Sequence, residues 1–203
     1  PSSRAADWPQ WRGPDNNNIS RETSLPVKWS PTENVTWKLA LPDFSGSTPI
    51  IWNDHVFVSS TEPRTKTLRA LCLDRNSGKV LWKQKTPVES IEELHPTMGN
   101  PAAATPACDG ERVFCTFLDG KDVVVSAYSL DGKQLWQKRP GIFTSVHGFC
   151  STPLPYKDKV IVNCDHDGPG YDRAELPDRR GKLPGYVLAE RAVSAAGPRR
   201  RSA

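Results

Sequence analysis

An internal repeat constrains the fold of this chain more than any other feature of its sequence. Three segments align without gaps on a Thr-Pro start: TPIIWNDHVFVSS at 48–60, TPACDGERVFCTF at 105–117 and TPLPYKDKVIVNC at 152–164. In each segment a short apolar stretch is followed by a polar turn and then by a β-branched or aromatic run. This order predicts a hairpin of two antiparallel strands, A and B.

The hairpins carry their turns and their prolines at matching positions. The predicted turns are Asn53-Asp54, Asp109-Gly110 and Lys157-Asp158. The prolines Pro49, Pro106 and Pro153 fall at the start of strand A, where a missing N–H disturbs a sheet least. Their placement supports the alignment of the three hairpins.

A second unit follows the first two hairpins, ALCLDRNSGKVLWKQ at 70–84 and AYSLDGKQLWQK at 127–138. Each unit reads as an alternating strand C, a Gly-containing turn and a strand D with a Leu-Trp pair. Trp37 matches the end of strand D in an earlier unit, and Trp82 and Trp136 follow it at spacings of 45 and 54 residues. Four short antiparallel strands at such a period are typical of propeller blades.

The predicted fold class is therefore all-β, an incomplete β-propeller of four-stranded antiparallel blades with about two full blades and parts of two others. Residues 1–32 are interpreted as an N-terminal extension that leads into the first strand, and residues 33–171 as the blades. Residues 172–203 form a tail rich in Arg, Pro and Ala, expected to be irregular, with disorder or a frameshift as its explanation. Because so few blades cannot close a ring, a truncated product with open edges prone to self-association is expected.

Charge and hydropathy narrow the possible partners. Residues 179–203 hold seven Lys or Arg and one acid, so the formal net charge of +4 leaves residues 1–178 slightly acidic. Nucleic acid is not expected as a partner, because this body offers no broad basic surface. No membrane span is expected, because no stretch approaches the roughly 20 apolar residues that a spanning helix needs. Ala5-Ala6 ahead of Asp7 resembles the end of a signal-peptide cleavage region, which favours a periplasmic or secreted location.

The pattern of an alternating strand, Leu-Asp, a Gly-Lys turn and Leu-Trp resembles the pyrroloquinoline-quinone-like (PQQ-like) repeat. That repeat occurs in quinoprotein dehydrogenases and in non-enzymatic outer-membrane assembly lipoproteins. The opening DWPQWRGPDNNNISRE and the later PVKWSPTENVTWK also resemble the start of secreted PQQ-like propellers of planctomycete-type bacteria. In those proteins the first residues lead into a strand that completes the last blade. The resemblance covers residues 7 to about 171.

Two of the five cysteines stand at positions that are aliphatic in other hairpins. Cys108 aligns with Ile51, and Cys115 aligns with Val58. This substitution is typical of a small buried hydrophobic residue. A tight turn after Cys108 would place it opposite Glu111, which is unfavourable for a bridge between Cys108 and Cys115.

Cys150 and Cys164 lie at the entry and exit of the third hairpin, so a disulfide between them is kept as the less favoured alternative. No Cys-x-x-Cys pair is present, which argues against zinc. Quinoprotein dehydrogenases hold PQQ between a tryptophan floor and a disulfide of two adjacent cysteines, with a calcium ion and a catalytic Asp. No two cysteines of this chain are adjacent, and Trp82 and Trp136 are interpreted as packing residues between blades.

Asp165 and Asp167 are weak candidates for metal binding. They place two carboxylates two residues apart ahead of a glycine, an arrangement that could donate oxygens to calcium. The following Gly168-Pro169-Gly170 adds no acidic ligand, so a simple blade loop is favoured and no metal site is predicted.

His95 and His147 precede strand A of their blades and are expected near a common face of the propeller. A histidine base beside Ser145 or Ser151 can be imagined, but no orienting acid or oxyanion motif accompanies it. Polar loop contacts are therefore favoured, and no catalytic residue is predicted.

These observations favour a non-enzymatic binding scaffold that presents its blade loops to a protein or carbohydrate partner, without a cofactor. The alternative is a fragment of a PQQ-dependent quinoprotein oxidoreductase, an alcohol or sugar dehydrogenase, which would need PQQ and calcium.

Overall fold

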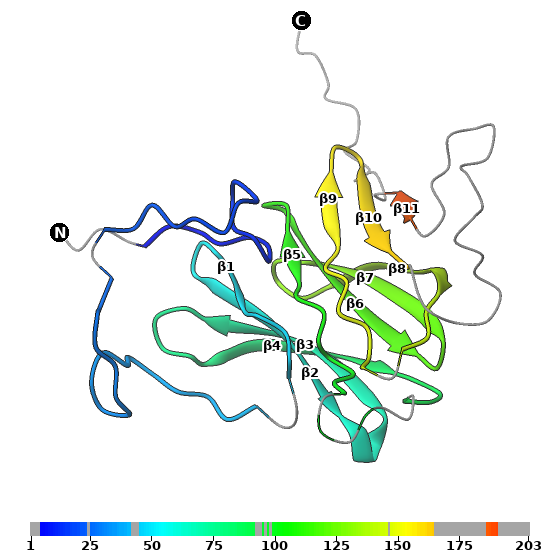
Figure 1. Ribbon diagram of the computed structural model, residues 1–203, viewed down its shortest axis with the longest axis horizontal. Helices are drawn as coiled ribbons and strands as arrows, with labels where there is room; N and C mark the ends of the chain where they lie inside the picture. The colour runs from blue at the N-terminus through cyan, green and yellow to red at the C-terminus, as the bar shows by residue number, and fades with distance from the viewer. Residues whose placement is uncertain are drawn as a thin grey trace, which may run out of the picture.

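A computed structural model of the protein describes residues 5–23, 25–41, 45–91, 95, 97, 99–145 and 147–164, and the backbone of 186–190. These residues form eleven strands, one short 3-10 helix and connecting loops (Figure 1). The strands make three antiparallel sheets, two with four strands and one with three. The predicted all-β fold of incomplete, four-stranded propeller blades is confirmed.

Each sheet follows the predicted strand order. The first blade contains β1 (Ile50–Trp52), β2 (His55–Glu62), β3 (Thr67–Asp74) and β4 (Val80–Pro87), with the 3-10 helix η1 (Pro63–Thr65) between β2 and β3. The second contains β5 (Ala107–Cys108), β6 (Arg112–Asp119), β7 (Asp122–Ser129) and β8 (Gln134–Ile142). The third contains β9 (Leu154–Tyr156), β10 (Lys159–Asn163) and β11 (Tyr186–Glu190), which are its strands A, B and C.

Strand β11 lies inside the segment that was expected to be irregular. Its backbone pairs antiparallel with β10, and Glu190 is the partner of Lys159. The expectation of an irregular tail is therefore corrected for Tyr186–Glu190, where the backbone bonds of β10 outweigh the unfavourable composition. Residues 165–185 and 191–203 lie outside the described residues.

The first and third A–B hairpins close with the predicted two-residue turns. Asn53 and Lys157 stand at the first turn position, each with a φ of 51°. Two-residue turns of this hand need a positive φ there, and Asn is among the residues that tolerate it best.

The second hairpin differs in register from the prediction. Cys108 pairs with Val113 and not with Glu111. The carboxylate of Asp109 accepts hydrogen bonds from the backbone amides of Glu111 and Arg112, at 3.0 and 2.7 Å. The amide of Asp109 also donates to the carbonyl of Arg112 at 3.1 Å, so the turn residues are Gly110 and Glu111, with Gly110 at a positive φ of 97°.

Tryptophans at the strand D position of the repeat join each blade to the next; Trp37 occupies this position although it lies in no strand of the structure. The indole N–H of Trp37 donates to the carbonyl of Arg75, and that of Trp82 donates to the carbonyl of Leu130, both at 2.8 Å. These carbonyls belong to the C–D turns of the first and second blades. The side chain of Trp136 is buried, but its indole N–H has no acceptor among the described residues.

The C–D turns carry glycines that the tryptophan rings require. Gly78 and Gly132 have φ values of 70° and 91°, a region open mainly to glycine. A Cβ on Gly132 would also lie 2.6 Å from the ring of Trp82, and one on Gly78 would lie 2.5 Å from Trp37. Both glycines therefore serve the turn and the close approach of the ring.

Strand B contributes a second link between blades. The hydroxyl of Ser59 donates to the carbonyl of Ala104, and that of Thr116 donates to the carbonyl of Ser151, both at 3.0 Å. In each case the acceptor directly precedes the Thr-Pro start of the following blade. The two bonds are equivalent in the repeat, so they fix successive blades in the same way.

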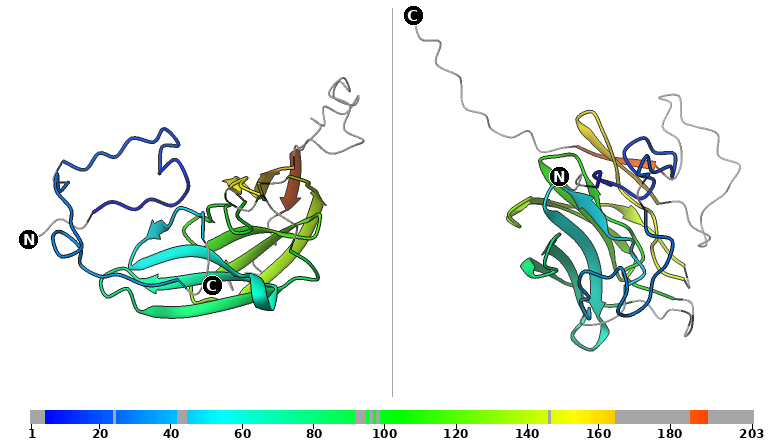
Figure 2. Two further views of the ribbon diagram at one scale, coloured as in Figure 1. Left: turned by 60° about the horizontal axis from the view of Figure 1, so that its bottom comes forward. Right: turned by 90° about the vertical axis from the view of Figure 1, so that its left-hand side faces the viewer.

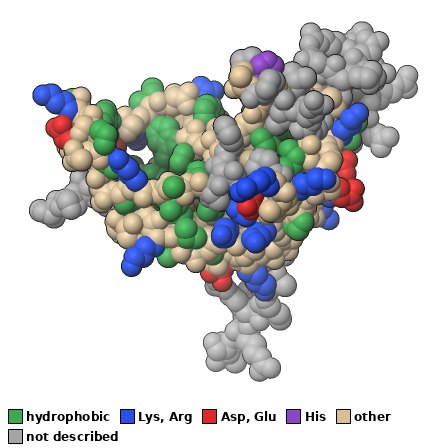
Figure 3. Space-filling view, turned by 90° about the horizontal axis from the view of Figure 1, so that it is seen from below, with side chains coloured by type: hydrophobic (Ala, Val, Ile, Leu, Met, Phe, Trp, Pro, Cys, Tyr) green, Lys and Arg blue, Asp and Glu red, His purple; other side chains and the backbone are tan. Residues whose placement is uncertain are grey.

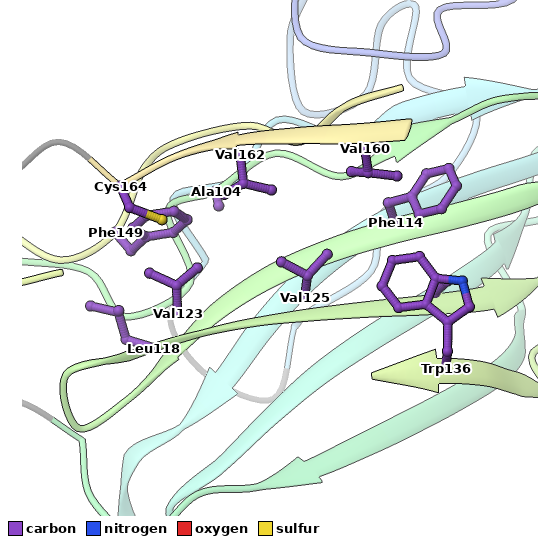
Figure 4. Packing of buried hydrophobic residues seen from close by; sticks show 11 residues of the cluster. Ala104, Phe114, Leu118, Val123, Val125, Trp136, Phe149, Val160, Val162 and Cys164 are labelled. Atoms are coloured by element: carbon purple, nitrogen blue, oxygen red, sulfur yellow. The ribbon is translucent and has the colours of Figure 1, made fainter. Parts of the chain in front are cut away.

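Hydrophobic clusters fill the spaces between the sheets. The cluster between the first two blades includes Ile50, Phe57, Leu68, Cys72, Val113, Cys115, Phe117 and Tyr128. The cluster between the second and third blades, drawn in Figure 4, includes Phe114, Val123, Val125, Trp136, Phe149, Val160 and Val162. Alternate residues of β6 face opposite clusters, as expected for a sheet covered on both faces.

The N-terminal segment lies along the strand A edge of the blades (Figures 1 and 2). Trp8 and Ile51 exchange two backbone hydrogen bonds of 2.9 Å, and the amide of Cys108 donates to the carbonyl of Pro9 at 2.8 Å. The family resemblance implied that such residues lead into a strand that completes the last blade. In this structure they instead add to β1 and reach β5.

Candidate functional site: the two ends of the blades

Antiparallel strands place the connecting loops at two opposite ends of each blade. The A–B and C–D turns lie at one end, and the B–C turns and the D-to-A linkers lie at the other. We call these the hairpin end and the linker end. Side chains with possible chemistry gather at both.

At the linker end, loops from two blades bring His95 and His147 together. Their ring centroids lie 5.9 Å apart with the planes tilted by 40°. The amide of Asn100 donates to the carbonyl of His147 at 3.2 Å, which ties the two loops to each other. The prediction that these histidines share one face is confirmed.

The polar groups around the histidine pair take part in loop contacts. The Nδ1 atom of His95 accepts from the amide of Thr97 at 3.3 Å and lies 3.2 Å from the Thr97 hydroxyl. The hydroxyl of Ser145 accepts from the amide of His147 at 3.2 Å, and the hydroxyl of Ser151 accepts from the amide of Asn163 at 3.3 Å. Each serine thus accepts a backbone N–H and shapes a loop, as a structural role requires.

A charged cluster at the same end was missed by the sequence analysis. Arg139 donates to the carboxylates of Asp119, at 2.6 Å, and Asp122, at 3.0 Å. Asp119 also accepts from the amides of Glu89 at 2.7 Å and Ser90 at 3.5 Å. The Asp-Gly-Lys-Asp turn at 119–122 was a signal, but its link to the 88–90 linker needs the three-dimensional structure.

The environment of Asp119 favours its charged form. Burial acts to raise the pKa of this carboxyl, but the hydrogen bonds from Arg139, Glu89 and Ser90 outweigh burial, so the pKa is lowered. The carboxylate therefore holds the B–C turn of the second blade against the linker from the first. Its polar groups are satisfied within the protein.

At the hairpin end, Asp7 anchors the N-terminal segment. Its carboxylate accepts from the amide of Asn53 at 2.9 Å and lies 3.6 Å from the guanidinium of Arg75. Arg75 also donates to the carbonyl of Ala5 at 2.7 Å. The segment is thus fixed to both the A–B and the C–D turn of the first blade.

The outer edge of the blades is basic. Lys83 and Lys85 on β4 and Lys138 on β8 are exposed, and neither strand contains an acid. Seen from below in Figure 1, the surface likewise shows more Lys and Arg than acidic side chains (Figure 3). Lysines on an edge strand oppose pairing with another sheet.

All five cysteines are free thiols. Burial raises the pKa of Cys72, Cys108 and Cys115 to about 12. Such thiols stay protonated at neutral pH and are poor nucleophiles and metal ligands. The disulfide alternative for Cys150 and Cys164 is not formed, and Cys164 is buried while Cys150 is exposed.

The weak metal candidates Asp165 and Asp167 lie outside the described residues. Within the described part of the chain, no group of three or more His, Cys, Asp or Glu side chains is placed to hold a metal ion. The same part of the chain contains no helix long and apolar enough to cross a membrane.

Sheets of four antiparallel strands that repeat and pack face to face define a β-propeller repeat protein. A PQQ-repeat family model described as outer membrane protein assembly factor BamB matches residues 27–190, and the chain belongs to this family.

Solved structures of PQQ-like propellers are similar to the chain. BamB from Moraxella catarrhalis is 22% identical with a TM-score of 0.46, and the match covers 63% of this chain and 36% of that structure. A europium-containing methanol dehydrogenase is 24% identical with a TM-score of 0.42 (62% and 22% covered). Quinohemoprotein alcohol dehydrogenase from Comamonas testosteroni is 17% identical with a TM-score of 0.41 (60% and 17% covered). The chain thus spans at most 36% of the length of these structures. A comparison with curated proteins found no match.

Proposed function

We propose that this chain is a non-enzymatic propeller segment that acts as a binding scaffold, presenting its blade loops to a protein or carbohydrate partner. Membership of the BamB family supports a role in assembly at the cell envelope, with a periplasmic or secreted location. Self-association through open blade edges stays a prediction.

The main support for this proposal is the surface at the linker end, which is formed by loops from two blades. His95 and His147 come from the linkers of two successive blades, and backbone bonds hold the linkers together. Because each blade adds one linker to the same face, the fold builds a binding surface from loops without changing the sheets. Imidazole rings offer both apolar contact and hydrogen bonding to a partner protein.

The repeated tryptophans have a structural use that differs from holding a quinone. Trp37 and Trp82 each donate their N–H to a neighbouring blade and lie against a turn glycine. Their rings are therefore committed to blade packing. They therefore give no support for a quinone site in this chain.

Site-specific photo-crosslinking tests the proposal in living cells with an outer membrane. Benzoylphenylalanine in place of the exposed His147 should give a discrete protein adduct. The same probe in place of Tyr156, which is 55% exposed at the hairpin end, is the control and should give none. Equal adducts at both positions, or none at either, would contradict a protein-binding linker end.

A titration with PQQ and calcium tests the enzymatic alternative separately. The scaffold proposal predicts no saturable change in quinone absorbance and no dye reduction with alcohols or sugars. Saturable binding together with substrate-dependent dye reduction would replace the scaffold by a dehydrogenase.

A further inference from the structure

A groove with uncommitted polar groups lies between the N-terminal segment and the start of the third blade. Residues of the segment form one wall and residues 152–154 form the other: Gln10, Trp11, Arg12, Asn16, Thr152, Pro153 and Leu154. Its volume of about 180 Å³ is below the roughly 300–1,000 Å³ of sites that enclose a whole small molecule, so the groove can hold only part of a ligand. The indole of Trp11 is exposed to 52%.

The backbone on both sides of Trp11 is fixed. Pro9 is bonded to Cys108, and the Gln10 side-chain amide donates to the carbonyl of Gly13 at 3.0 Å. The carbonyl of Arg12 accepts from the amide of Asn18, also at 3.0 Å. An exposed indole on such a braced loop can bind a ligand at a low cost in conformational entropy.

Three side chains of this wall form no hydrogen bond with the described part of the chain. Trp37 and Trp82 donate their indole N–H groups to carbonyls, whereas Trp11 makes no hydrogen bond with another described residue. The guanidinium of Arg12 and the side-chain amide of Asn16 likewise make none with the described part of the chain. A flat apolar ring, a free cation and a free amide therefore converge on one groove.

We propose that this groove binds an acidic sugar residue, such as a uronic acid of a polysaccharide. The apolar face of a pyranose ring fits against the indole of Trp11, and Arg12 is suited to pair with the carboxylate. Asn16 and Thr152 supply donors and acceptors for ring hydroxyls. The inference rests on the proposed scaffold function and names a ligand for a second surface, beside the strand A edge.

A saccharide fits these groups better than an acidic peptide does. A peptide carboxylate would engage Arg12 but would leave the exposed ring and the amide without a matching surface. A pyranose ring offers an apolar face and hydroxyls at once, so that all three groups gain partners. An acidic peptide is therefore kept as an outcome of the test.

Isothermal titration calorimetry of the 203-residue chain with trigalacturonate, and with an uncharged trisaccharide, tests the inference. Wild type should bind trigalacturonate saturably and bind the uncharged sugar more weakly. Trp11→Ala should weaken both by about tenfold or more, because the stacking surface is lost. Arg12→Gln should weaken trigalacturonate alone by about tenfold, because only the charge pair is lost.

Two matched variants control for nonspecific effects. Trp29 is 64% exposed but lies outside the groove, so Trp29→Ala should change the affinity by less than about twofold. Arg21 is exposed and already paired with Asp15, so Arg21→Gln should also leave binding unchanged. Circular dichroism should show the same thermal transition for all four variants, since each side chain is exposed.

Three results would overturn the inference: no saturable binding of either sugar by wild type, equal losses in Trp29→Ala and Trp11→Ala, or tighter binding of hexaglutamate than of trigalacturonate. The crosslink at position 147 reports on a separate surface, because His147 does not line the groove. Failure of the sugar site therefore leaves the scaffold proposal to its own test.

Discussion

The two interfaces between blades repeat the same packing but not the same set of hydrogen bonds. Between the first and second blades, Trp82 bonds the C–D turn and Ser59 bonds the linker. Between the second and third, Thr116 forms the equivalent linker bond, while the N–H of Trp136 is buried without an acceptor in the described part of the structure. The strand pairing makes Glu190 of the third blade equivalent to Asp74 of the first. The residue equivalent to Arg75, whose carbonyl accepts from Trp37, is therefore residue 191, which lies outside the described residues.

This difference teaches which element completes a blade interface. The tryptophan on strand D is satisfied only by the C–D turn of the following blade. The described residues of the third blade supply the hydrophobic face and the linker carbonyl, but they supply no acceptor for the indole N–H of Trp136. An unsatisfied buried donor costs about 1–3 kcal/mol, so the two interfaces should differ measurably in stability.

The largest expected effect on stability comes from adding a Cβ at Gly132, which lies against the ring of Trp82. Gly132→Ala should reduce the free energy of unfolding by about 3 kcal/mol, since strain at positive φ adds to a clash with the ring. Chemical denaturation followed by circular dichroism measures it. Gly120→Ala is the control: its φ is also positive, at 59°, but a Cβ would meet only the Ser90 hydroxyl. Equal losses would show that the Trp82 contact contributes nothing.

A comparison of tryptophan variants tests the hydrogen bond itself. Trp82→Phe removes ring area and a satisfied N–H, leaving the carbonyl of Leu130 without its donor. Trp136→Phe removes similar area and an N–H that has no partner among the described residues. Trp82→Phe should therefore be more destabilising by about 1 kcal/mol in urea denaturation. The reverse order would mean that the two interfaces do not differ as the structure indicates.

Two adjacent serines of β2 allow the contribution of the hydrogen bond from Ser59 to the linker to be measured separately. Ser59 and Ser60 are both buried, but Ser59 donates to Ala104 whereas the hydroxyl of Ser60 has no partner in the described structure. Ser59→Ala should cost about 1 kcal/mol, and Ser60→Ala should be neutral or slightly stabilising. The unfolding midpoints of the two variants give the answer, and a loss of equal size in both would contradict the linker bond.

The strands and turns of the blades could be predicted from local sequence patterns, whereas contacts between residues far apart in the sequence could not. The alternation of β2 and the Asn53 turn act within a few residues, so the sequence alone indicated both. The turn after Cys108 was placed too early in the sequence, because Gly110 and not Asp109 takes the turn position with positive φ, while the Asp109 carboxylate accepts from the amides of Glu111 and Arg112. The pairing of Trp8 with Ile51 spans 43 residues and has no local signature, and the groove beside Trp11 depends on that pairing.

The smallest expected effect concerns the carboxylate that ties the first two blades at the linker end. Burial opposes ionisation of Asp119, but its hydrogen bonds from Arg139 and two amides dominate, so its pKa is lower in the folded than in the unfolded protein. Its contribution is therefore fully present above the unfolded pKa and is lost as the pH falls through the folded one. Arg139 is 47% exposed, so solvent screening limits this contribution to about 1 kcal/mol or less.

Asp119→Asn should accordingly flatten the loss of stability below about pH 4, measured as the difference in urea midpoints between acidic and neutral pH. Asp15→Asn is the control, because Asp15 pairs with Arg21 on the exposed N-terminal segment. An unchanged pH dependence in Asp119→Asn would mean that the Asp119 contacts do not couple the first blade to the second. In that case the tryptophan and serine bonds alone would distinguish the two interfaces.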